Sequence, residues 1–229
     1  MKGNINELAI FAGAGGGLLA SSILGWETVC AVELDWHKRC VLTQRQNDGL
    51  LPIFPIWDDI RTFDGRTWRG GIDVVSGGFP CQPFSTAASG QNNADDLWPE
   101  MFRVVANVAP RYVFAENVSA KAIDQAADDL ESLGYQTKAI SLSAKDLGAD
   151  HVRDRCWLLA YTDNKSELLR GFNAEMAQLQ SMAQGVWSSD TGISGISYGM
   201  AYRMDRLKAT GNGQVPIVAV AALKLLCEG

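Results

Sequence analysis

The chain has 229 residues, of which 47% are hydrophobic and 20% charged, a composition that is ordinary for a globular protein and argues against intrinsic disorder. A chain of this length buries enough surface to fold without disulfides or a structural metal. Acidic residues exceed basic ones by 26 to 20, and the net charge of −6 excludes nucleic-acid binding driven by overall positive charge but not a local basic groove. The five cysteines are scattered and the histidines number only two, so we expect no zinc site and a reducing compartment.

Residues 8–26 carry no charge, which raises the question of a signal peptide or a membrane span. Several glycines and serines make this segment too polar for a lipid-spanning helix, and Glu7 stands where a signal peptide needs positive charge. We therefore expect neither.

Short apolar runs alternate with amphipathic stretches as far as Tyr161. The expected strands are residues 7–12, 28–34, 72–76, 112–116, 135–142 and 156–161, and the expected helices are 17–24, 36–46, 97–108, 122–133 and 217–227. Strands that are apolar without alternation are buried on both faces, so this order predicts an α/β fold with a doubly wound, mostly parallel sheet. We expect a main domain over 1–161, a small irregular region over 162–203, and a segment over 204–229 that returns to the main domain.

A glycine-rich turn, Phe11-Ala-Gly-Ala-Gly-Gly-Gly17, lies between the first expected strand and the first expected helix. Glycines let a ligand approach the backbone closely, and a helix N-terminus favours anionic groups. Glu33 ends the next strand, where a carboxylate can bind ribose hydroxyls. The pattern favours an adenosine-containing cofactor over a turn with no ligand. A dinucleotide is less favoured, because the spacing is not GxGxxG.

Cys81 lies in the loop Gly77-Gly-Phe-Pro-Cys-Gln-Pro-Phe-Ser85, at the carboxyl end of an expected strand. Most lone cysteines are small buried hydrophobes. The stiff loop beside the expected cofactor crevice favours a nucleophile instead, although a thiol needs activation to ionise near neutral pH.

Three polar segments follow. Glu116 ends an apolar run, and partial burial would raise its pKa toward neutrality; a solvated loop carboxylate is the alternative. Arg153 and Arg155 point to one side of a strand, which suits a phosphate or a base carbonyl, or else an ion-pair cluster with neighbouring aspartates. Asn212 opens the last helix, where it caps the helix or contacts a ligand.

Taken together and in this order, these segments resemble the DNA (cytosine-5) methyltransferase family. The motifs are the FAGxGG turn, Glu33, Asp59-Ile60, the PCQPFS loop, the ENV triplet from Glu116, the arginine pair and the GN segment. The resemblance implies a Rossmann-like fold that uses S-adenosylmethionine, releases S-adenosylhomocysteine and needs no metal. It also implies methyl transfer to carbon-5 of a cytosine flipped out of double-stranded DNA.

The resemblance also implies residue roles. Cys81 would be the nucleophile, Glu116 would contact ring nitrogen N3, and Arg153 and Arg155 would support the base and the catalytic loop. Residues 84–93 are expected to form a lid over the base. The implied cofactor-binding residues are Phe11, Gly13, Gly15, Glu33, Asp59, Ile60, Pro80, Leu97, Asn212 and Val215.

This chain departs from the family pattern at several points. His151 stands where the family usually has glutamine, and Gln214 stands where it usually has an apolar residue. The target-recognition region, 162–203, is short, and its candidate cations across and just after it are few: Lys165, Arg170, Arg203, Arg206 and Lys208. Its brevity points to short or relaxed specificity, or to an incomplete element that needs a second subunit through self-association. With no room for a regulatory or restriction domain, we expect a compact cytoplasmic enzyme of a bacterium or phage.

Two alternatives stay open. One is the tRNA cytosine-5 methyltransferase branch, which shares the catalytic motifs. The other is a non-catalytic module that binds nucleic acid or S-adenosylmethionine without turnover, against which Cys81 and Glu116 argue.

Overall fold

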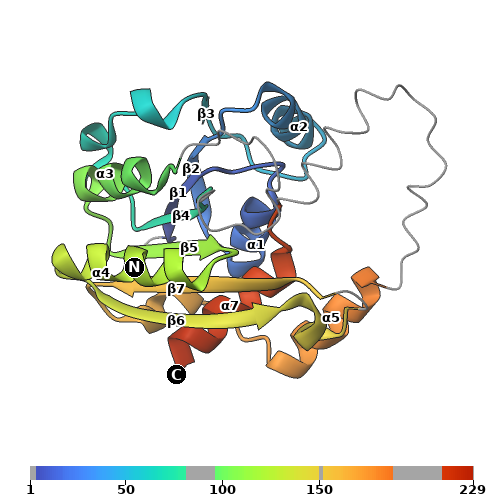
Figure 1. The fold of residues 1–229 in the computed structure, drawn as a ribbon. Helices are drawn as coiled ribbons and strands as arrows, with labels where there is room; N and C mark the ends of the chain where they lie inside the picture. Colours follow the sequence, from blue (N-terminus) through green and yellow to red (C-terminus); the bar gives the residue numbers. More distant parts are fainter. Residues whose placement is uncertain (1–3, 81–95, 150–151, 188–212, 229) are drawn as a thin grey trace, which may run out of the picture.

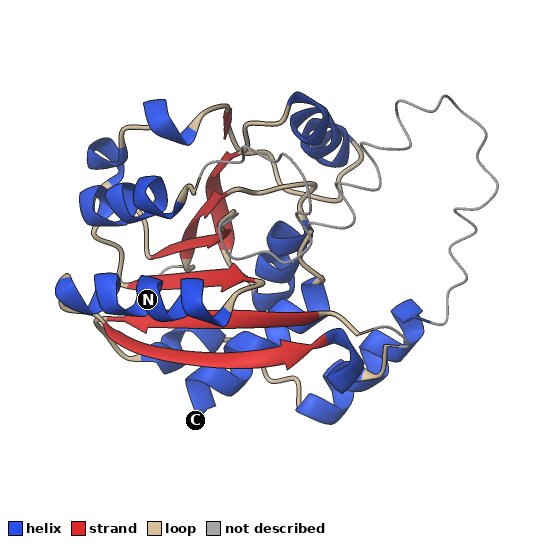
Figure 2. Ribbon diagram, in the orientation of Figure 1, coloured by secondary structure: helices blue, strands red, loops and turns tan. Residues whose placement is uncertain are grey.

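The computed structural model describes residues 4–80, 96–149, 152–187 and 213–228. Its strands form one sheet in the order β3-β2-β1-β4-β5-β7-β6 (Figures 1 and 2). The parallel strands are β1 (Asn6–Ile10), β2 (Glu27–Val32), β3 (Ile56–Trp57), β4 (Val74–Gly78) and β5 (Tyr112–Asn117). Strand β7 (Asp154–Tyr161) pairs antiparallel with β5 and with β6 (Gln136–Ser143). The expected mostly parallel sheet is confirmed.

Helices cover both faces of this sheet, so it is doubly wound as predicted. Helices α1 (Gly16–Leu24), α2 (Trp36–Asn47) and α7 (Pro216–Glu228) pack on one face. Helices α3 (Trp98–Val108) and α4 (Ala120–Ser132) pack on the other, where their buried side chains join those of Leu8, Val75 and Val113 in one cluster. Helix α7 is buried along most of its length, so it fills the core rather than capping it.

Strand β5 shows how the sequence positions the site. All six of its residues are buried, which explains the continuous apolar run. Side chains alternate between faces, so Tyr112, Phe114 and Glu116 share the α1/α7 face. Phe114 stacks on Trp157 of β7 with ring centroids 5.3 Å apart. Glu116 is the next residue on that face, at the carboxyl end of the strand.

Most boundaries agree with the sequence prediction to within two residues. Strand β4 runs two residues later than expected, because Gly77 and Gly78 pair with Ala115 and Glu116 instead of ending the strand. The sequence did not predict the two-residue β3 or the short 3-10 helices η1 (Ile60–Thr62), η2 (Gly65–Trp68), η3 (Ala144–Leu147) and η4 (Lys165–Leu169). It also did not predict α5 (Met176–Trp187), which packs against η3 and α7.

The uncharged segment 8–26 forms the end of β1, the glycine turn and the nine-residue α1. No helix within the described ranges combines the length and the hydropathy needed to cross a membrane.

A buried carboxylate lies between α1 and the sheet. Glu7 of β1 is fully buried and accepts hydrogen bonds from Ser21 Oγ at 2.6 Å, Thr28 Oγ1 at 2.7 Å and Ser76 Oγ at 2.6 Å. Burial raises the pKa of Glu7, and the three hydroxyl donors oppose that rise. One group on β1 thus ties together α1, β2 and β4.

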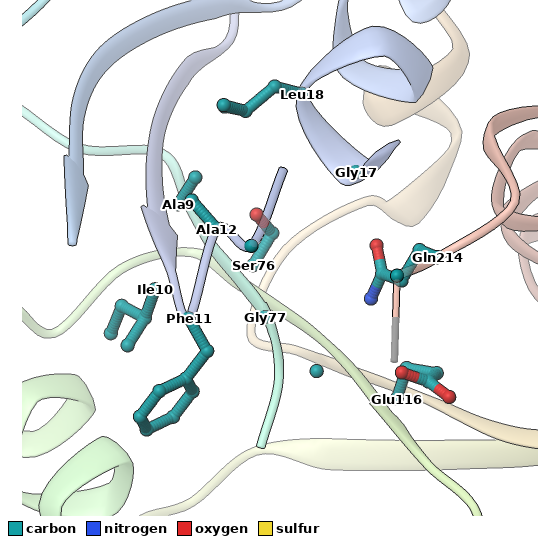
Figure 3. A pocket seen from close by; sticks show the side chains of 13 residues that line it. Ala9, Ile10, Phe11, Ala12, Gly17, Leu18, Ser76, Gly77, Glu116 and Gln214 are labelled. Carbon is teal, nitrogen blue, oxygen red and sulfur yellow. The ribbon is translucent and has the colours of Figure 1, made fainter. Parts of the chain in front are cut away.

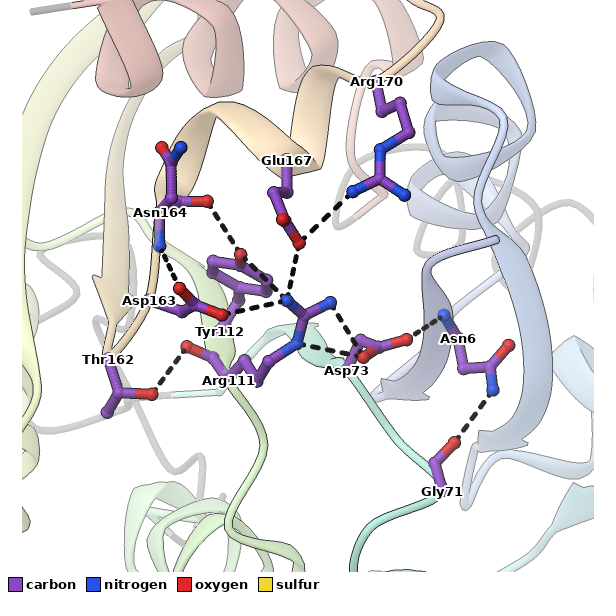
Figure 4. A network of polar contacts seen from close by, with 10 residues as sticks. All are labelled: Asn6, Gly71, Asp73, Arg111, Tyr112, Thr162, Asp163, Asn164, Glu167 and Arg170. Atoms are coloured by element: carbon purple, nitrogen blue, oxygen red, sulfur yellow. Dashed lines mark hydrogen bonds and ion pairs between the residues drawn. The ribbon is translucent and has the colours of Figure 1, made fainter. Parts of the chain in front are cut away.

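A polar network fastens the chain after β7 to the amino-terminal edge of the sheet (Figure 4). Arg111 lies at its centre, with Nη2 3.0 Å from Asp73 Oδ1, Nη1 3.2 Å from Asp163 Oδ2 and Nη1 2.7 Å from Glu167 Oε2. Nearby, Trp26 Nε1 donates to the carbonyl of Leu168 at 2.9 Å. These contacts fix η4 on the edge opposite to the one where β1, β4 and β5 end.

We expect Arg111→Met to lower the free energy of unfolding by about 1–2 kcal/mol, because it leaves three carboxylates close together without their shared cation. Urea denaturation would measure the loss. Arg66→Met is the matched control, since the Arg66–Asp64 pair is exposed and should matter little. Equal effects of the two substitutions would contradict the central role of Arg111.

Candidate active site

The glycine turn after β1 has an unusual backbone. Phe11, Gly13 and Gly15 all adopt positive φ, at 55°, 60° and 92°. For Phe11 this conformation costs about 1–3 kcal/mol, and such strain concentrates at functional sites. A Cβ placed on Gly13 would meet nothing closer than 3.9 Å, so its backbone faces open space. The turn can therefore admit a ligand against the main chain at Gly13.

Glu33 holds this turn to the end of β2. Its Oε2 accepts from the Gly13 N–H at 2.7 Å, and its Oε1 accepts from the Asp35 N–H at 2.9 Å. The carboxylate is buried, yet each oxygen keeps acceptor capacity for one further donor. That capacity, beside an open glycine backbone, fits the hydroxyls of a ribose.

Other predicted cofactor residues lie near this edge but outside the pocket described below. Asp59 caps η1 by accepting from the Arg61 N–H at 2.9 Å, a bond that lowers the pKa of its carboxyl. Arg103 of α3 donates to the carbonyl of Ile60 at 2.6 Å and so fixes this loop. Val215 lies just before α7 and packs against the α1/α7 core.

The chain leading to the predicted nucleophile is held from two sides. Asn117 Nδ2 donates to the Phe79 carbonyl at 2.8 Å, and the Leu97 N–H donates to the Pro80 carbonyl at 3.3 Å. Pro80 and Leu97, both predicted cofactor residues, are thereby brought together. Cys81, the expected lid 84–93, His151 and Asn212 lie outside the described residues.

Glu116 is the best-defined polar group of the site. It is buried, and its Oε1 lies 2.8 Å from Arg155 Nε. Its Oε2 lies over Gly78, 2.6 Å from where a Cβ would be, so a side chain at position 78 would displace it. Burial raises the pKa of Glu116, while Arg155, Arg153 and a hydrogen bond from Gln214 oppose the rise. The solvated-carboxylate alternative is therefore excluded.

Arg153 and Arg155 lie on the Glu116 side of the sheet, as alternation predicted. Arg153 Nη2 donates to the Gly213 carbonyl at 2.6 Å, and burial lowers the pKa of its guanidinium. Arg155 Nη1 also donates to the Asp154 carbonyl at 2.7 Å. The pair thus connects the start of β7 to Glu116 and to the segment that enters α7.

A small pocket joins the glycine turn to Glu116 (Figure 3). It contains Phe11 and Gly13 of the predicted cofactor site and Glu116 of the predicted catalytic set. Gly15 instead faces α2, where a Cβ would lie 2.9 Å from Leu42 Cδ2, and its φ of 92° is one that residues with side chains rarely adopt. The pocket is lined by Ala9, Ile10, Phe11, Ala12, Gly13, Gly17, Leu18, Ser76, Gly77, Gly78, Glu116, Gly213 and Gln214.

Sequence reasoning missed two polar residues of this pocket. Ser76 is a hydroxyl inside a buried strand, which is itself a usable signal. Gln214 was noted only as a departure from an apolar pattern. Across the described ranges, no three His, Cys, Asp or Glu side chains gather as metal ligands would.

The fold and the residues at the carboxyl ends of the parallel strands together indicate the class of protein. A crystal structure of a prophage-encoded candidate DNA modification methyltransferase from E. coli shares the fold, with a TM-score of 0.55 and 25% identity over 69% of this chain and 47% of that one. The protein thus has a Rossmann-like α/β methyltransferase fold.

The family model for C-5 cytosine-specific DNA methylases matches residues 5–194, and the chain belongs to that family. It is 31% identical to the Type II methyltransferase M.NgoMIV of Neisseria gonorrhoeae over 163 residues, 67% of this chain and 51% of that protein. It is 32% identical to M1.HphI of Haemophilus parahaemolyticus over 177 residues, 70% of this chain and 46% of that protein. The chain thus spans about half the length of these relatives.

We expect Glu33→Ala to weaken binding of S-adenosylmethionine, the cofactor that the resemblance implies, roughly tenfold or more, because it removes the predicted ribose acceptor and the partner of the Gly13 N–H. Isothermal titration calorimetry with the cofactor would measure this, and duplex binding should change much less. Glu33→Gln keeps one oxygen for the Gly13 N–H, so its cofactor affinity should fall between those of the wild type and Glu33→Ala. A loss of duplex affinity as large as the loss of cofactor affinity would contradict the assignment.

Proposed function

We propose that the protein is a DNA cytosine-5 methyltransferase, which transfers a methyl group from S-adenosylmethionine to carbon-5 of a cytosine flipped out of double-stranded DNA. Membership of the C-5 cytosine-specific DNA methylase family supports this proposal. The observation that carries it is the pocket in which Glu116, paired with Arg155 at 2.8 Å, shares a wall with the glycine turn. Glu116, the proposed proton donor to the cytosine, thus lies beside the predicted site of the methyl donor.

The residues present fit the proposed cofactor. Gly13 offers an open backbone, and Glu33 offers acceptors for the ribose. The other residues proposed to hold it are Phe11, Gly15, Asp59, Ile60, Pro80, Leu97, Asn212 and Val215. When bound, S-adenosylmethionine supplies an electrophilic methyl group on a sulfonium.

The chain's own residues then activate the base. The Cys81 thiolate forms a bond to carbon-6, which breaks the aromaticity of the ring and makes carbon-5 nucleophilic. Glu116 donates a proton toward N3 and so neutralises the charge that develops there; its raised pKa keeps a proton available nearer to neutral pH. After carbon-5 takes the methyl group, a base removes the carbon-5 proton, the Cys81 Sγ–carbon-6 bond breaks, and N3 returns its proton to Glu116.

We propose that residues 1–161 do this chemistry, that 162–203 recognise the target, and that 204–229 return to the catalytic domain. Two of the candidate DNA contacts also have partners within the protein. Lys165 Nζ donates to the Leu226 carbonyl at 2.9 Å, and Arg170 pairs with Glu167 at 3.3 Å. Arg203, Arg206 and Lys208 lie outside the described residues and stay candidates.

The proposed setting is the reducing cytoplasm. Cys30, Cys40, Cys156 and Cys227, the described cysteines, are all free thiols. Self-association stays a proposal that rests on the short recognition region alone, and sedimentation of the protein with and without duplex DNA would test it.

The direct test is transfer of labelled methyl from S-adenosylmethionine to duplex DNA and, in parallel, to tRNA. Incorporation into the duplex alone supports the proposal, and incorporation into tRNA alone would replace it with the RNA branch. Bisulfite sequencing of DNA from expressing cells would then identify the recognised sequence.

We expect Cys81→Ala to abolish methyl transfer while cofactor affinity stays unchanged, because only the covalent step is lost. A duplex containing 5-fluorocytosine should trap the wild-type protein as a covalent adduct and leave the variant free. Turnover by Cys81→Ala near the wild-type rate would refute the assignment of Cys81 as the nucleophile.

Glu116→Gln should still fold, but its rate of methyl transfer should fall about 10²–10⁴-fold, which is the usual contribution of a general acid.

A further inference from the structure

Gln214 crosses the first turn of α1 at very short range. Its carbonyl oxygen lies 2.1 Å from where a Cβ of Gly16 would be, and its Oε1 lies 2.5 Å from where a Cβ of Gly17 would be. Side chains at positions 16 and 17 would clash with Gln214, which occupies the space beside these two glycines. On the other side, Arg153 Nη2 holds the adjoining Gly213 carbonyl at 2.6 Å. The backbone around Gln214 is thus fixed from two directions.

The side-chain amide has a defined orientation. The N-cap of α1 is Gly15, which has no side chain to satisfy the first N–H groups of the helix. The amide oxygen faces this positive end of the helix, as its partial negative charge favours. Nε2 faces the opposite way, 3.3 Å from where a Cβ of Gly78 would be, above which Glu116 Oε2 lies. Figure 3 shows the amide between Gly17 and Glu116.

We propose that Gln214 is a positioning residue: the hydrogen bond that its Nε2 donates to the Glu116 carboxylate holds this carboxylate over Gly78. The inference rests on the proposed function, in which Glu116 gives a proton to the base. An apolar side chain, usual at this place in the resemblance described above, could fill the same space but donate nothing.

The groups that face Glu116 in the described part of the chain come from three elements. Arg155 lies on β7, Arg153 lies in its lead-in, and Gln214 comes from the segment before α7, whereas β4 offers only Gly78. Ser76, which also lines the pocket, donates to Glu7. Gln214 is therefore the neutral donor in a setting of two cations, and its removal leaves the net charge unchanged.

A donor to the carboxylate stabilises the ionised form, so the acidity of Glu116 in the free protein reports on this contact. Gln214→Met keeps a similar length and removes the donor; Gln214→Glu keeps the shape and places a like charge there. The pKa of Glu116 should rise by about one unit in the methionine variant, a tenfold change in the dissociation constant, and further in the glutamate variant.

The measurement is a carbon-detected NMR titration of glutamate carboxyls, with the Glu116 signal identified by its loss in Glu116→Gln. Gln178→Met, on α5, removes an amide that accepts from the Glu175 N–H and should leave Glu116 unchanged. Thermal unfolding of each variant first establishes that it is folded.

A second route reaches the same contact without changing Gln214. Gly17→Ala introduces a methyl group that meets only the end of the Gln214 side chain, so it should push the amide aside and raise the pKa of Glu116. In a Gln214→Met background the same alanine should add nothing. If a Gln214 variant does not fold, Gly17→Ala alone decides the question.

A Glu116 titration that is the same in wild type, Gln214→Met and Gly17→Ala would overturn the proposal, as would equal shifts from Gly17→Ala in both backgrounds. The titration uses neither DNA nor cofactor, so its result does not depend on methyl transfer. In the active enzyme, the alkaline limb of the pH profile of kcat/KM should move to higher pH in Gln214→Met, because Glu116 keeps its proton longer. If the protein shows no methyl transfer but the pKa of Glu116 shifts among the variants as expected, the proposed function is refuted and the role of Gln214 stands.

Discussion

Four segments far apart in the sequence meet at one point, because glycines there leave room for close contact. A Cβ on Gly77 would lie 2.5 Å from the Ile10 carbonyl oxygen, and one on Gly16 would lie 2.1 Å from the Gln214 carbonyl oxygen. Glu116 lies as closely over Gly78. The first glycine lets β4 run tightly beside β1, the second lets the entry to α7 cross α1, and the third makes room for the carboxylate. The candidate site depends on this close approach.

The charges around Glu116 then decide what chemistry this site can perform. A carboxylate as buried as Glu116 is costly unless it is paired, and removing one partner of such a pair leaves the other charge stranded. Arg155 supplies the pair at 2.8 Å, and Arg153 adds a second positive field while being held by a backbone carbonyl. Burial and the cations pull the proton affinity of Glu116 in opposite directions. Such a balance suits a group that both holds and releases a proton.

The sequence was informative wherever one residue type and one local pattern carried the signal. Apolar runs predicted the parallel strands, and alternation placed Arg153 and Arg155 on one side. The glycine turn and Glu33 were predicted as a unit, and the bond from Gly13 to Glu33 joins them. Family resemblance added the residue roles.

What the sequence could not supply was contact between distant elements. A two-residue strand such as β3 has no periodicity, and it is defined only by pairing with β2. Gly15 was expected to shape a ligand site, but its constraint also comes from Leu42. Lys165 was one of the candidate DNA contacts, and its ammonium also donates to the Leu226 carbonyl of α7. In each case the deciding neighbour lies too far along the chain for a local pattern to reveal it.

The three hydroxyl groups that donate to Glu7 limit which single substitutions the core tolerates. A single replacement at position 7 takes the acceptor from the Thr28 and Ser76 hydroxyls and leaves Ser21 Oγ only the Gly17 carbonyl, and a single replacement among Ser21, Thr28 and Ser76 withdraws support from a buried acid. Each such single replacement is expected to destabilise the fold. The four positions should therefore be inherited together, and lineages that abandon the acid should have exchanged its companions for apolar residues as well.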